Sequence, residues 1–448
     1  MADTGPALWP VPRENAGEKS RRRRSRVRGC VRDCQCRSES PSSSAMDLLR
    51  FFCGALLAAL FSGSLTAAAP TAAARTAPPT FAQREPGGDG VVFDTRFAGA
   101  RLDECRADAP GEYTVVVRPE NRPINDSAWF AFKVSAATAR TITVRLQVEG
   151  GAMRYLPKIS SDGLAWFPLP AEAYARGANA GEGILLLEVG PAPLWIAAQE
   201  MVSTERLTAW VRTLERLPYV TRGEFGRTHL GQPLQKLEIG TGAKHYVVVF
   251  GRQHPPETTG SLALMRFVET VAGNSDLARS FRREFSVLVV PLINPDGVDR
   301  GHWRHNVGGV DTNRDWGRFT QPETRAVGDE VTALAQSARL WLHLDFHSTK
   351  TDVFYTQPDT KPAKPAGFTK AWLEALQERL PAYTVKRSST TTPTLTTSHN
   401  WAHATFGIPA ITYEIGDDTD RALLQQIAGA AAEEMMKKLL ALKAAEQP

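Results

Sequence analysis

The stretch from Tyr246 to Val271 reads YVVVFGRQHPPETTGSLALMRFVETV. Its first five residues, 246–250, form one apolar run, which is the pattern of a strand covered on both faces of a sheet. A polar loop follows, and a helical segment is expected from Thr258 onward. A strand, a loop and a helix in this order predict an α/β unit, and the loop lies where α/β proteins usually build their sites.

Strands and helices of this kind alternate through the second half of the chain. A second apolar run covers residues 286–292, and apolar residues recur at helical spacing after Met201. Further helices are expected at residues 258–271, 324–336, 368–379 and 421–444. Residues 201–445 therefore predict an α/β domain, in which helices flank a sheet.

Residues 91–200 show a different pattern. Short alternating runs are separated by turn residues, and these runs lie at 113–117, 129–134, 141–148, 184–189 and 194–198. Such short strands at regular spacing predict a small antiparallel β-sandwich domain ahead of the α/β domain.

The first 90 residues differ from both domains. Residues 46–69 contain an apolar run at 51–65 followed by small residues, which is typical of a secretory signal peptide. A membrane anchor is the alternative, but the run is shorter than the about 20 apolar residues that span a bilayer. Residues 1–45 are then an upstream extension without a fold, and residues 70–90 a disordered linker. We expect an exported protein, periplasmic or secreted, without stable membrane insertion after cleavage.

Charge and cysteine content limit the partners and the bonds. Ten of the 53 basic and five of the 48 acidic residues lie within residues 1–45, which leaves 43 of each in the rest of the chain. This neutral remainder argues against nucleic acid as a partner. Only Cys105 of the five cysteines follows the expected cleavage point, so no intramolecular disulfide is expected.

Three residues near strand ends are candidate zinc ligands. His254 and Glu257 are close enough in the loop to reach one ion, although such a pair also occurs by chance. His347 ends the run 342–346 and supplies a third ligand, which leaves one position open as in catalytic zinc sites. His343 is a rival, but about 13 Å of strand at about 3.3 Å per residue separates it from His347. We interpret His343 as structural.

Two further features have both a structural and a functional interpretation. Glu414 lies in the apolar strand 411–415, either paired with Arg421 or acting as a general base. The polar stretch Gly301–Trp316 is either a solvated loop or part of a site. Its candidate residues are Arg304, Asp311, Asn313 and Arg314.

Together these residues resemble the zinc metallocarboxypeptidases with the pancreatic-carboxypeptidase type of fold, over about residues 201–443. Besides the three ligands, the motifs are Phe225–Thr228 with Gly231–Pro233, Asn294–Gly297, Trp303–Arg304, Asp311–Arg314 and Thr412–Glu414. The resemblance implies a mixed central β-sheet flanked by helices. Ala128–Phe132 and Asp345–His347, with Asp352–Tyr355, are similar to the cytosolic-carboxypeptidase branch, which has an N-terminal β domain.

The resemblance also implies a role for each candidate. One Zn²⁺ ion would be bound by His254, Glu257 and His347. Glu414 would act as general base towards the zinc-bound water, and Arg304 would stabilise the developing oxyanion.

The remaining roles concern the substrate and the support of the ligands. Arg314 with Asn313 would bind the C-terminal carboxylate of the substrate. Asp311 would accept the second ring N–H of His254. His399 falls on the segment that lines the family's specificity pocket, where it either favours acidic or small polar side chains or is only a wall residue.

The chain departs from the family pattern at two positions. Thr392 stands where the family has a substrate-capping tyrosine, which puts the substrate-closing step in question. Gln232 replaces an arginine expected in the first motif, which predicts a weaker outer substrate contact.

The sequence thus predicts an exported zinc-dependent metallocarboxypeptidase that hydrolyses C-terminal residues from peptides or proteins. A zinc-dependent deacylase or amidohydrolase of the related class is an alternative, because it shares a His-x-x-Glu and later His site. A non-catalytic peptide-binding protein on this scaffold is another, but retention of Glu414 and all three ligands argues against it.

Overall fold

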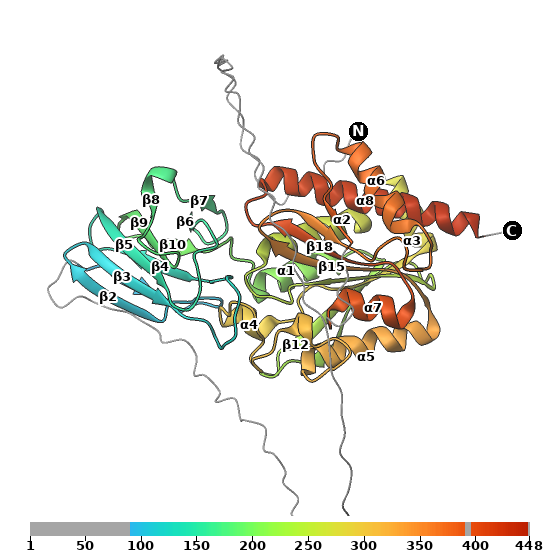
Figure 1. The fold of residues 1–448 in the computed structure, drawn as a ribbon, viewed down its shortest axis with the longest axis horizontal. Coiled ribbons are helices and arrows are strands. Elements are labelled where there is room, and N and C mark those ends of the chain that lie inside the picture. Colours follow the sequence, from blue (N-terminus) through green and yellow to red (C-terminus); the bar gives the residue numbers. More distant parts are fainter. Residues whose placement is uncertain (1–89, 390–395, 447–448) are drawn as a thin grey trace, which may run out of the picture. The chain divides into compact units, whose positions relative to one another are not determined.

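The structure is a computed structural model that describes residues 90–389 and 396–446 (Figure 1). The predicted extension at 1–45 and signal peptide at 46–69 lie outside the described residues, as do nearly all of the predicted linker and Thr392. Within the described residues, strands β1 to β10 precede the first α-helix, and a large sheet with its helices follows.

Two five-stranded sheets form the N-terminal part. The first has the order β1-β4-β10-β6-β7, and all of its pairs are antiparallel. Its strands are β1 (Val92–Asp94), β4 (Ala131–Ser135), β10 (Leu194–Ala197), β6 (Lys158–Ser160) and β7 (Phe167–Pro168). The second has the order β2-β3-β5-β9-β8, with strands β2 (Glu104–Ala109), β3 (Glu112–Val117), β5 (Arg140–Val148), β9 (Glu182–Val189) and β8 (Tyr174–Arg176).

One pair in the second sheet differs from the predicted antiparallel arrangement. Strands β3 and β5 are parallel, with Tyr113 opposite Val144 and Val117 opposite Val148. The chain leaves β3, forms β4 in the other sheet and then returns to β5. Such a crossover, unlike a hairpin, aligns two neighbouring strands in the same direction.

Both sheets of the N-terminal part contribute to one hydrophobic core. Phe132 and Ile196 of the first sheet and Val115 and Val144 of the second are fully buried in it. This confirms the predicted β-sandwich, since each sheet covers the apolar face of the other. Trp303, which belongs to the C-terminal half of the chain, is also fully buried in this core.

The C-terminal part contains an eight-stranded mixed sheet in the order β11-β12-β14-β13-β15-β18-β16-β17. Its central strands β14, β13, β15 and β18 run parallel and are buried on both faces, as the apolar runs predict. The strands are β11 (Val220–Arg227), β12 (Pro233–Ile239), β13 (His245–Gly251), β14 (Ser286–Val290), β15 (Arg339–Thr349), β16 (Val353–Tyr355), β17 (Arg387–Ser388) and β18 (Ala410–Gly416).

Helices cover both faces of the mixed sheet (Figure 1), which confirms the predicted α/β architecture. One face carries α1 (Thr204–Leu214), α2 (Thr258–Ala272), α3 (Asp276–Glu284), α6 (Phe368–Arg379) and α8 (Arg421–Ala445). The other carries α5 (Pro322–Ser337) and α7 (Ser398–Phe406). The short helix α4 (Pro295–Asp299) follows β14, and 3₁₀ turns cover η1 (Ala171–Ala173) and η2 (Thr312–Arg314).

Apart from the five-residue α4, two of these helices were not predicted from the sequence. Helix α3 is mostly charged and buries only Ala278, Phe281 and Arg282. Helix α7 has nine residues and buries only Ser398 and Ala402. Helix α7 lacks a clear apolar stripe, and that of α3 consists only of Leu277, Ala278 and Phe281, which is too short to stand out in the sequence.

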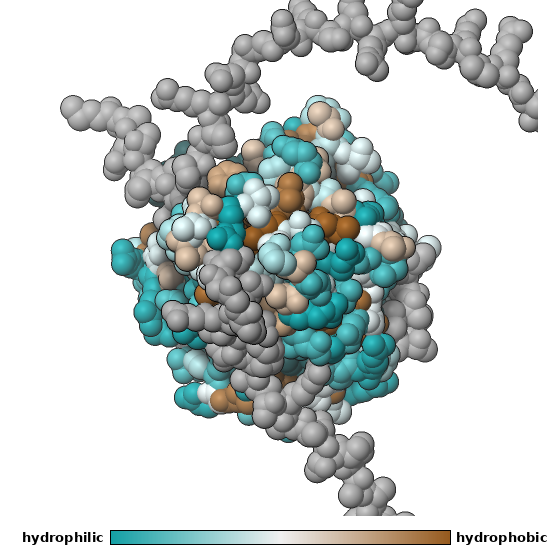
Figure 2. Space-filling view, turned by 90° about the vertical axis from the view of Figure 1, so that its left-hand side faces the viewer, coloured by the Kyte–Doolittle hydropathy of each residue, from teal (hydrophilic) through white to brown (hydrophobic). Residues whose placement is uncertain are grey.

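The surface of the described residues is mostly polar. Figure 2 shows one face, on which hydrophobic residues form a small group within a largely hydrophilic surface. The large apolar side chains that are more than 40% exposed are Leu156, Leu164, Phe167, Leu186 and Leu230. None of the helices in residues 90–389 and 396–446 is long and apolar enough to cross a membrane.

Candidate active site

The carboxyl ends of three neighbouring parallel strands position the candidate residues. Strand β13 ends at Gly251 and leads into the loop that carries His254 and Glu257. The neighbouring strand β15 carries His347, and β18 carries Glu414 directly opposite it in the register. In a parallel sheet these ends meet at one edge, where α/β proteins bind their ligands.

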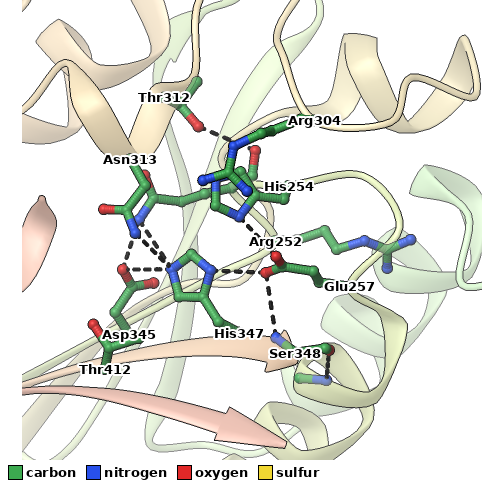
Figure 3. A network of polar contacts seen from close by, with 12 residues as sticks. Arg252, His254, Glu257, Arg304, Thr312, Asn313, Asp345, His347, Ser348 and Thr412 are labelled. Carbon is green, nitrogen blue, oxygen red and sulfur yellow. Dashed lines mark hydrogen bonds and ion pairs between the residues drawn. The ribbon is translucent and has the colours of Figure 1, made fainter. Parts of the chain in front are cut away.

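The loop after β13 has an unusual backbone. Arg252 has a positive φ of 53°, which is a rare conformation for a residue with a side chain. Its buried guanidinium donates from Nε to the carbonyl of Pro255 at 2.9 Å and from Nη1 to Ser261 Oγ at 3.0 Å. These bonds keep the loop closed, so His254 and Glu257 face the same point (Figure 3).

The three predicted ligands converge. One donor atom each from His254, Glu257 and His347 lies within 4.8 Å of the others, and all three residues are buried. Glu257 is 2.8 Å from Nδ1 of His254 through one carboxylate oxygen and 2.7 Å from Nδ1 of His347 through the other (Figure 3). Two imidazoles and a carboxylate are the donors that zinc prefers.

The outer ring nitrogens show that this cluster fits a metal. Nε2 of His254 is 2.9 Å from Oδ1 of Asp311, and Nε2 of His347 is 2.9 Å from Oδ2 of Asp345. Each carboxylate can accept the Nε2 proton, so Nδ1, which faces the centre, becomes available to a metal ion once it has lost its own proton. Both rings are therefore oriented as metal ligands require.

The same contacts determine the charges in the cluster. Burial alone would raise the pKa of Glu257, but His254 and His347 outweigh it and lower that pKa well below its usual range. Burial alone would lower the pKa of His347, but Asp345 and Glu257 outweigh it and raise that pKa. The centre is thus a buried group of carboxylates around two imidazoles, which attracts a cation.

Glu414 differs from the other carboxylates. Burial, followed by the charge of Glu257, raises the pKa of Glu414 to about 8. Its Oε2 atom is buried and has no hydrogen-bond partner among the described residues. The structural alternative, a pair with Arg421, does not form, because Arg421 binds Glu200 at 2.6 Å.

The structure brings part of the polar stretch 301–316 to the same place. Arg304 donates from Nε to Oδ2 of Asp311 at 2.7 Å, so Asp311 binds both Arg304 and His254. Asn313 Nδ2 lies 3.3 Å from Nε2 of His347, and its Oδ1 accepts the backbone N–H of Ser398. The side chain of Arg314 is exposed. Burial alone would raise the pKa of Asp311, but His254, Arg304 and Arg314 outweigh it and lower that pKa below its usual range.

The two other histidines lie beside the cluster rather than in it. His399, on α7, is 2.9 Å from Thr412 Oγ1 of β18, two residues before Glu414. His343 is fully buried with its ring edge on Phe250, at 4.7 Å between ring centroids. Burial lowers the pKa of both histidines to about 4.

Gln232 contacts carboxylates of its own domain. Its Nε2 atom donates to Asp296 at 3.0 Å and to Asp299 at 3.1 Å. The side-chain amide of Gln232, which stands in place of the family's arginine, therefore stabilises the turn around α4.

Sequence reasoning missed several residues around the centre. Asp345 was not predicted as the partner of His347, although residues two apart on a strand share a face. Gln253 donates to the same carboxylate at 2.6 Å. Arg154 comes from the β-sandwich and binds Asp417 of the β18 end at 2.7 Å and the carbonyl of Ser348 at 3.1 Å.

Comparison with known proteins identifies the family to which this fold belongs. Residues 207–436, about half of the chain, match the family described as zinc carboxypeptidase. The chain belongs to this family. Its metal is therefore zinc, and the cluster of His254, Glu257 and His347 provides the donors for one ion.

Several relatives share parts of this sequence. Cytosolic carboxypeptidase 6 of Caenorhabditis elegans is 23% identical over 301 residues, which are 60% of this chain and 65% of that protein. Cytosolic carboxypeptidase 2 of Xenopus tropicalis is 36% identical over 125 residues, which are 26% of this chain and 13% of that protein. The chain thus matches less than two thirds of the length of either relative.

Solved bacterial structures share the fold over a longer range. A metallo-carboxypeptidase from Burkholderia cenocepacia has a TM-score of 0.67 and 22% identity, covering 80% of this chain and 99% of its own. A metallo-carboxypeptidase from Pseudomonas aeruginosa has a TM-score of 0.64 and 19% identity, covering 78% of this chain. The likeness therefore extends beyond residues 207–436 into the β-sandwich.

Proposed function

We propose that this chain is a zinc-dependent metallocarboxypeptidase that removes C-terminal residues from peptides or proteins. The observation that supports it most is the unpaired carboxylate oxygen of Glu414 opposite the cluster of His254, Glu257 and His347. A buried carboxylate without a partner is costly, which argues for a role in chemistry.

The residues of the chain have distinct tasks in this proposal. When bound, a zinc ion supplies a Lewis acid for the scissile carbonyl, lowers the pKa of water, and favours the ionised form of Glu414. Glu414, ionised in this way, accepts the proton of the attacking water and passes it to the leaving amine. Arg304, oriented by Asp311, donates to the oxyanion that develops on the carbonyl.

Recognition of a free C-terminus is assigned to Arg314 and Asn313. The Arg314 guanidinium is exposed, and its Nη1 donates to the carbonyl of Asn313 at 2.7 Å, which orients it. Its remaining N–H groups can bind a carboxylate with two parallel hydrogen bonds. This geometry makes the proposed enzyme an exopeptidase.

A peptide-library digest read by mass spectrometry tests the proposal. We expect the zinc-loaded protein to shorten peptides one residue at a time from the C-terminus, and Glu414→Gln and a chelated sample to leave them intact. Cleavage of N-acyl compounds only would instead support a deacylase, and peptide binding without cleavage a binding protein. Equal activity of Glu414→Gln and wild type contradicts the mechanism.

The preference for the C-terminal side chain depends on His399. Its position beside Thr412 is compatible with selecting acidic or small polar side chains, and also with a plain wall of the pocket. The guanidinium of Arg387 does not contribute to this selection, because it is paired with Asp359 at 2.7 Å. Comparing kcat/KM for peptides ending in Glu, Lys and Phe distinguishes these two roles of His399. A clear preference for Lys would exclude selection of acidic side chains.

We also propose that the protein is exported, because residues 46–69 have the pattern of a signal peptide. The related proteins from animals are named cytosolic, so this proposal separates the chain from them. Fractionation of expressing cells, with N-terminal sequencing of the product, tests it. A cytosolic product that retains residues 46–69 would contradict export.

A further inference from the structure

The loop that carries Arg304 is bound by a carboxylate of the β-sandwich. Glu120, three residues after β3, has a side chain only 4% exposed. Its two oxygens accept the backbone N–H groups of Trp303 at 2.7 Å, Arg304 at 2.9 Å and His305 at 2.6 Å. Three successive backbone donors on one carboxylate fix the path of the loop.

The two histidines of this loop, which had no role in the sequence analysis, complete the arrangement. His305 Nδ1 lies 3.2 Å from Oε1 of Glu120. His302 Nδ1 lies 2.9 Å from the carbonyl of His305, which closes the loop on itself. Although burial opposes ionisation, the hydrogen bond to His305 and the nearby His302 lower the pKa of Glu120 to about 2, so the carboxylate is charged.

The side chains on either side of these contacts point in opposite directions. The indole of Trp303 packs into the core of the β-sandwich and is fully buried. The neighbouring Arg304 extends to Asp311, which in turn binds His254. The loop is therefore anchored in the β-sandwich through Trp303, whereas Arg304 extends into the active site of the α/β domain.

A second contact supports the same loop further along. Asn121, next to Glu120, donates from Nδ2 to the carbonyl of Gly309 at 2.9 Å. Gly309 has a positive φ of 76°, and it precedes Asp311 by two residues. Two adjacent side chains of the β-sandwich thus bind both limbs of the loop between Arg304 and Asp311.

We propose that Glu120 is a positioning residue for catalysis, and that it orients Arg304 towards the reacting carbonyl by holding the backbone of residues 303–305. The β-sandwich is then a working part of the active site rather than an attached module. This inference rests on the proposed carboxypeptidase function, because it concerns the orientation of the oxyanion donor.

The substitution Glu120→Gln tests the proposal. Glutamine keeps the shape but replaces one acceptor oxygen with an NH₂ group, which faces a backbone N–H and repels it. We expect kcat to fall at least about 10-fold, because a small misplacement of a catalytic group is costly. KM should change little, since Arg314 and Asn313 bind the substrate carboxylate. Glu120→Asp retains a carboxylate and should retain more activity than Glu120→Gln.

Glu149→Gln is the matched control. Glu120 and Glu149 line one surface hollow, but Glu149 binds Arg118 of its own domain at 2.5 Å and its side chain is half exposed. This variant should keep the wild-type kcat. Thermal unfolding of each variant separates lost stability from lost orientation.

A double-mutant cycle with Arg304→Ala provides the decisive measurement. If Glu120 acts through Arg304, then adding Glu120→Gln to Arg304→Ala lowers kcat no further. Equal losses in both backgrounds, or an unchanged kcat in Glu120→Gln, would overturn the proposal. A wild-type protein that hydrolyses no peptide would instead contradict the proposed function itself.

Discussion

The substitutions Asp311→Asn and Asp345→Asn should separate zinc binding from catalysis. Each carboxylate accepts the Nε2 proton of one ligand, Asp311 from His254 and Asp345 from His347, both at 2.9 Å. Loss of such a partner typically weakens metal affinity 10- to 100-fold, which is about 1.4 to 2.7 kcal/mol. We expect both variants to bind zinc more weakly by this amount.

The two variants should differ once zinc is saturating. Asp311 uses its other oxygen to bind Arg304 Nε at 2.7 Å, whereas Asp345 also binds Gln253 and Ser398, which do not contact the substrate in our proposal. An asparagine at position 311 leaves Arg304 without a charged acceptor. Since removal of an oxyanion donor costs about 100- to 1000-fold in kcat, its misorientation should cost at least about 10-fold.

The assay combines competition with a fluorescent chelator, which gives the zinc Kd, with peptide hydrolysis over a range of zinc concentrations. Asp359→Asn, an exposed carboxylate paired with Arg387, is the control and should match wild type. We expect zinc to restore kcat fully in Asp345→Asn and only partly in Asp311→Asn. Full recovery in both variants, or an unchanged zinc Kd in either, would refute this account of the site.

Two other substitutions give separate readouts. Arg314→Lys should raise KM about 10-fold for peptides with a free C-terminus, because lysine cannot form the forked contact, and amidated peptides would show whether the carboxylate is the group recognised. His343→Gln should flatten the pH dependence of stability in the metal-free protein. Because burial lowers the folded-state pKa of His343 to about 4, the unfolded chain binds more protons between pH 4 and 6.5. This histidine therefore costs about 2 kcal/mol of unfolding free energy between pH 7 and 5, which urea titrations at both pH values measure; an identical loss in His343→Gln would contradict it.

The metal ligands and the strands that carry them could be predicted because the signals are local. Long apolar runs predict buried parallel strands, and His254, Glu257 and His347 follow or end such runs. Helix α6, at residues 368–379, has the predicted bounds because its apolar residues recur at helical spacing. The arrangement at the sheet edge follows from parallel pairing alone.

The support of the site could not be predicted, because it depends on contacts between distant residues. Glu120 and Arg304 are 184 residues apart, and Arg154 and Asp417 are 263 apart. Sequence periodicity cannot show that a charged residue of one domain contacts a residue of the other. Asp345 is different, because its spacing of two from His347 on one strand places both side chains on the same face of the sheet.

The four carboxylates of the centre link metal binding to proton release. Asp311 and Asp345 are balanced by histidines, and Glu257 lies between two imidazoles, but Glu414 has no cationic partner in hydrogen-bond contact among the described residues. Because burial and the charge of Glu257 raise its pKa to about 8, this carboxyl is mostly protonated at pH 7 in the metal-free protein.

A dication next to Glu414 favours its ionised form, so zinc binding at pH 7 should release this proton together with any that the histidines lose. Glu414→Gln removes only the proton that the carboxyl group of Glu414 releases. Calorimetric titration with zinc at pH 7, in buffers of different ionisation enthalpy, should therefore show up to about one proton fewer released by the variant than by wild type. The difference should shrink at pH 9, where the carboxylate is already ionised. If wild type and Glu414→Gln released the same number of protons at pH 7, Glu414 would already be ionised in the metal-free protein. Zinc binding would then not be what prepares Glu414 to act as the base.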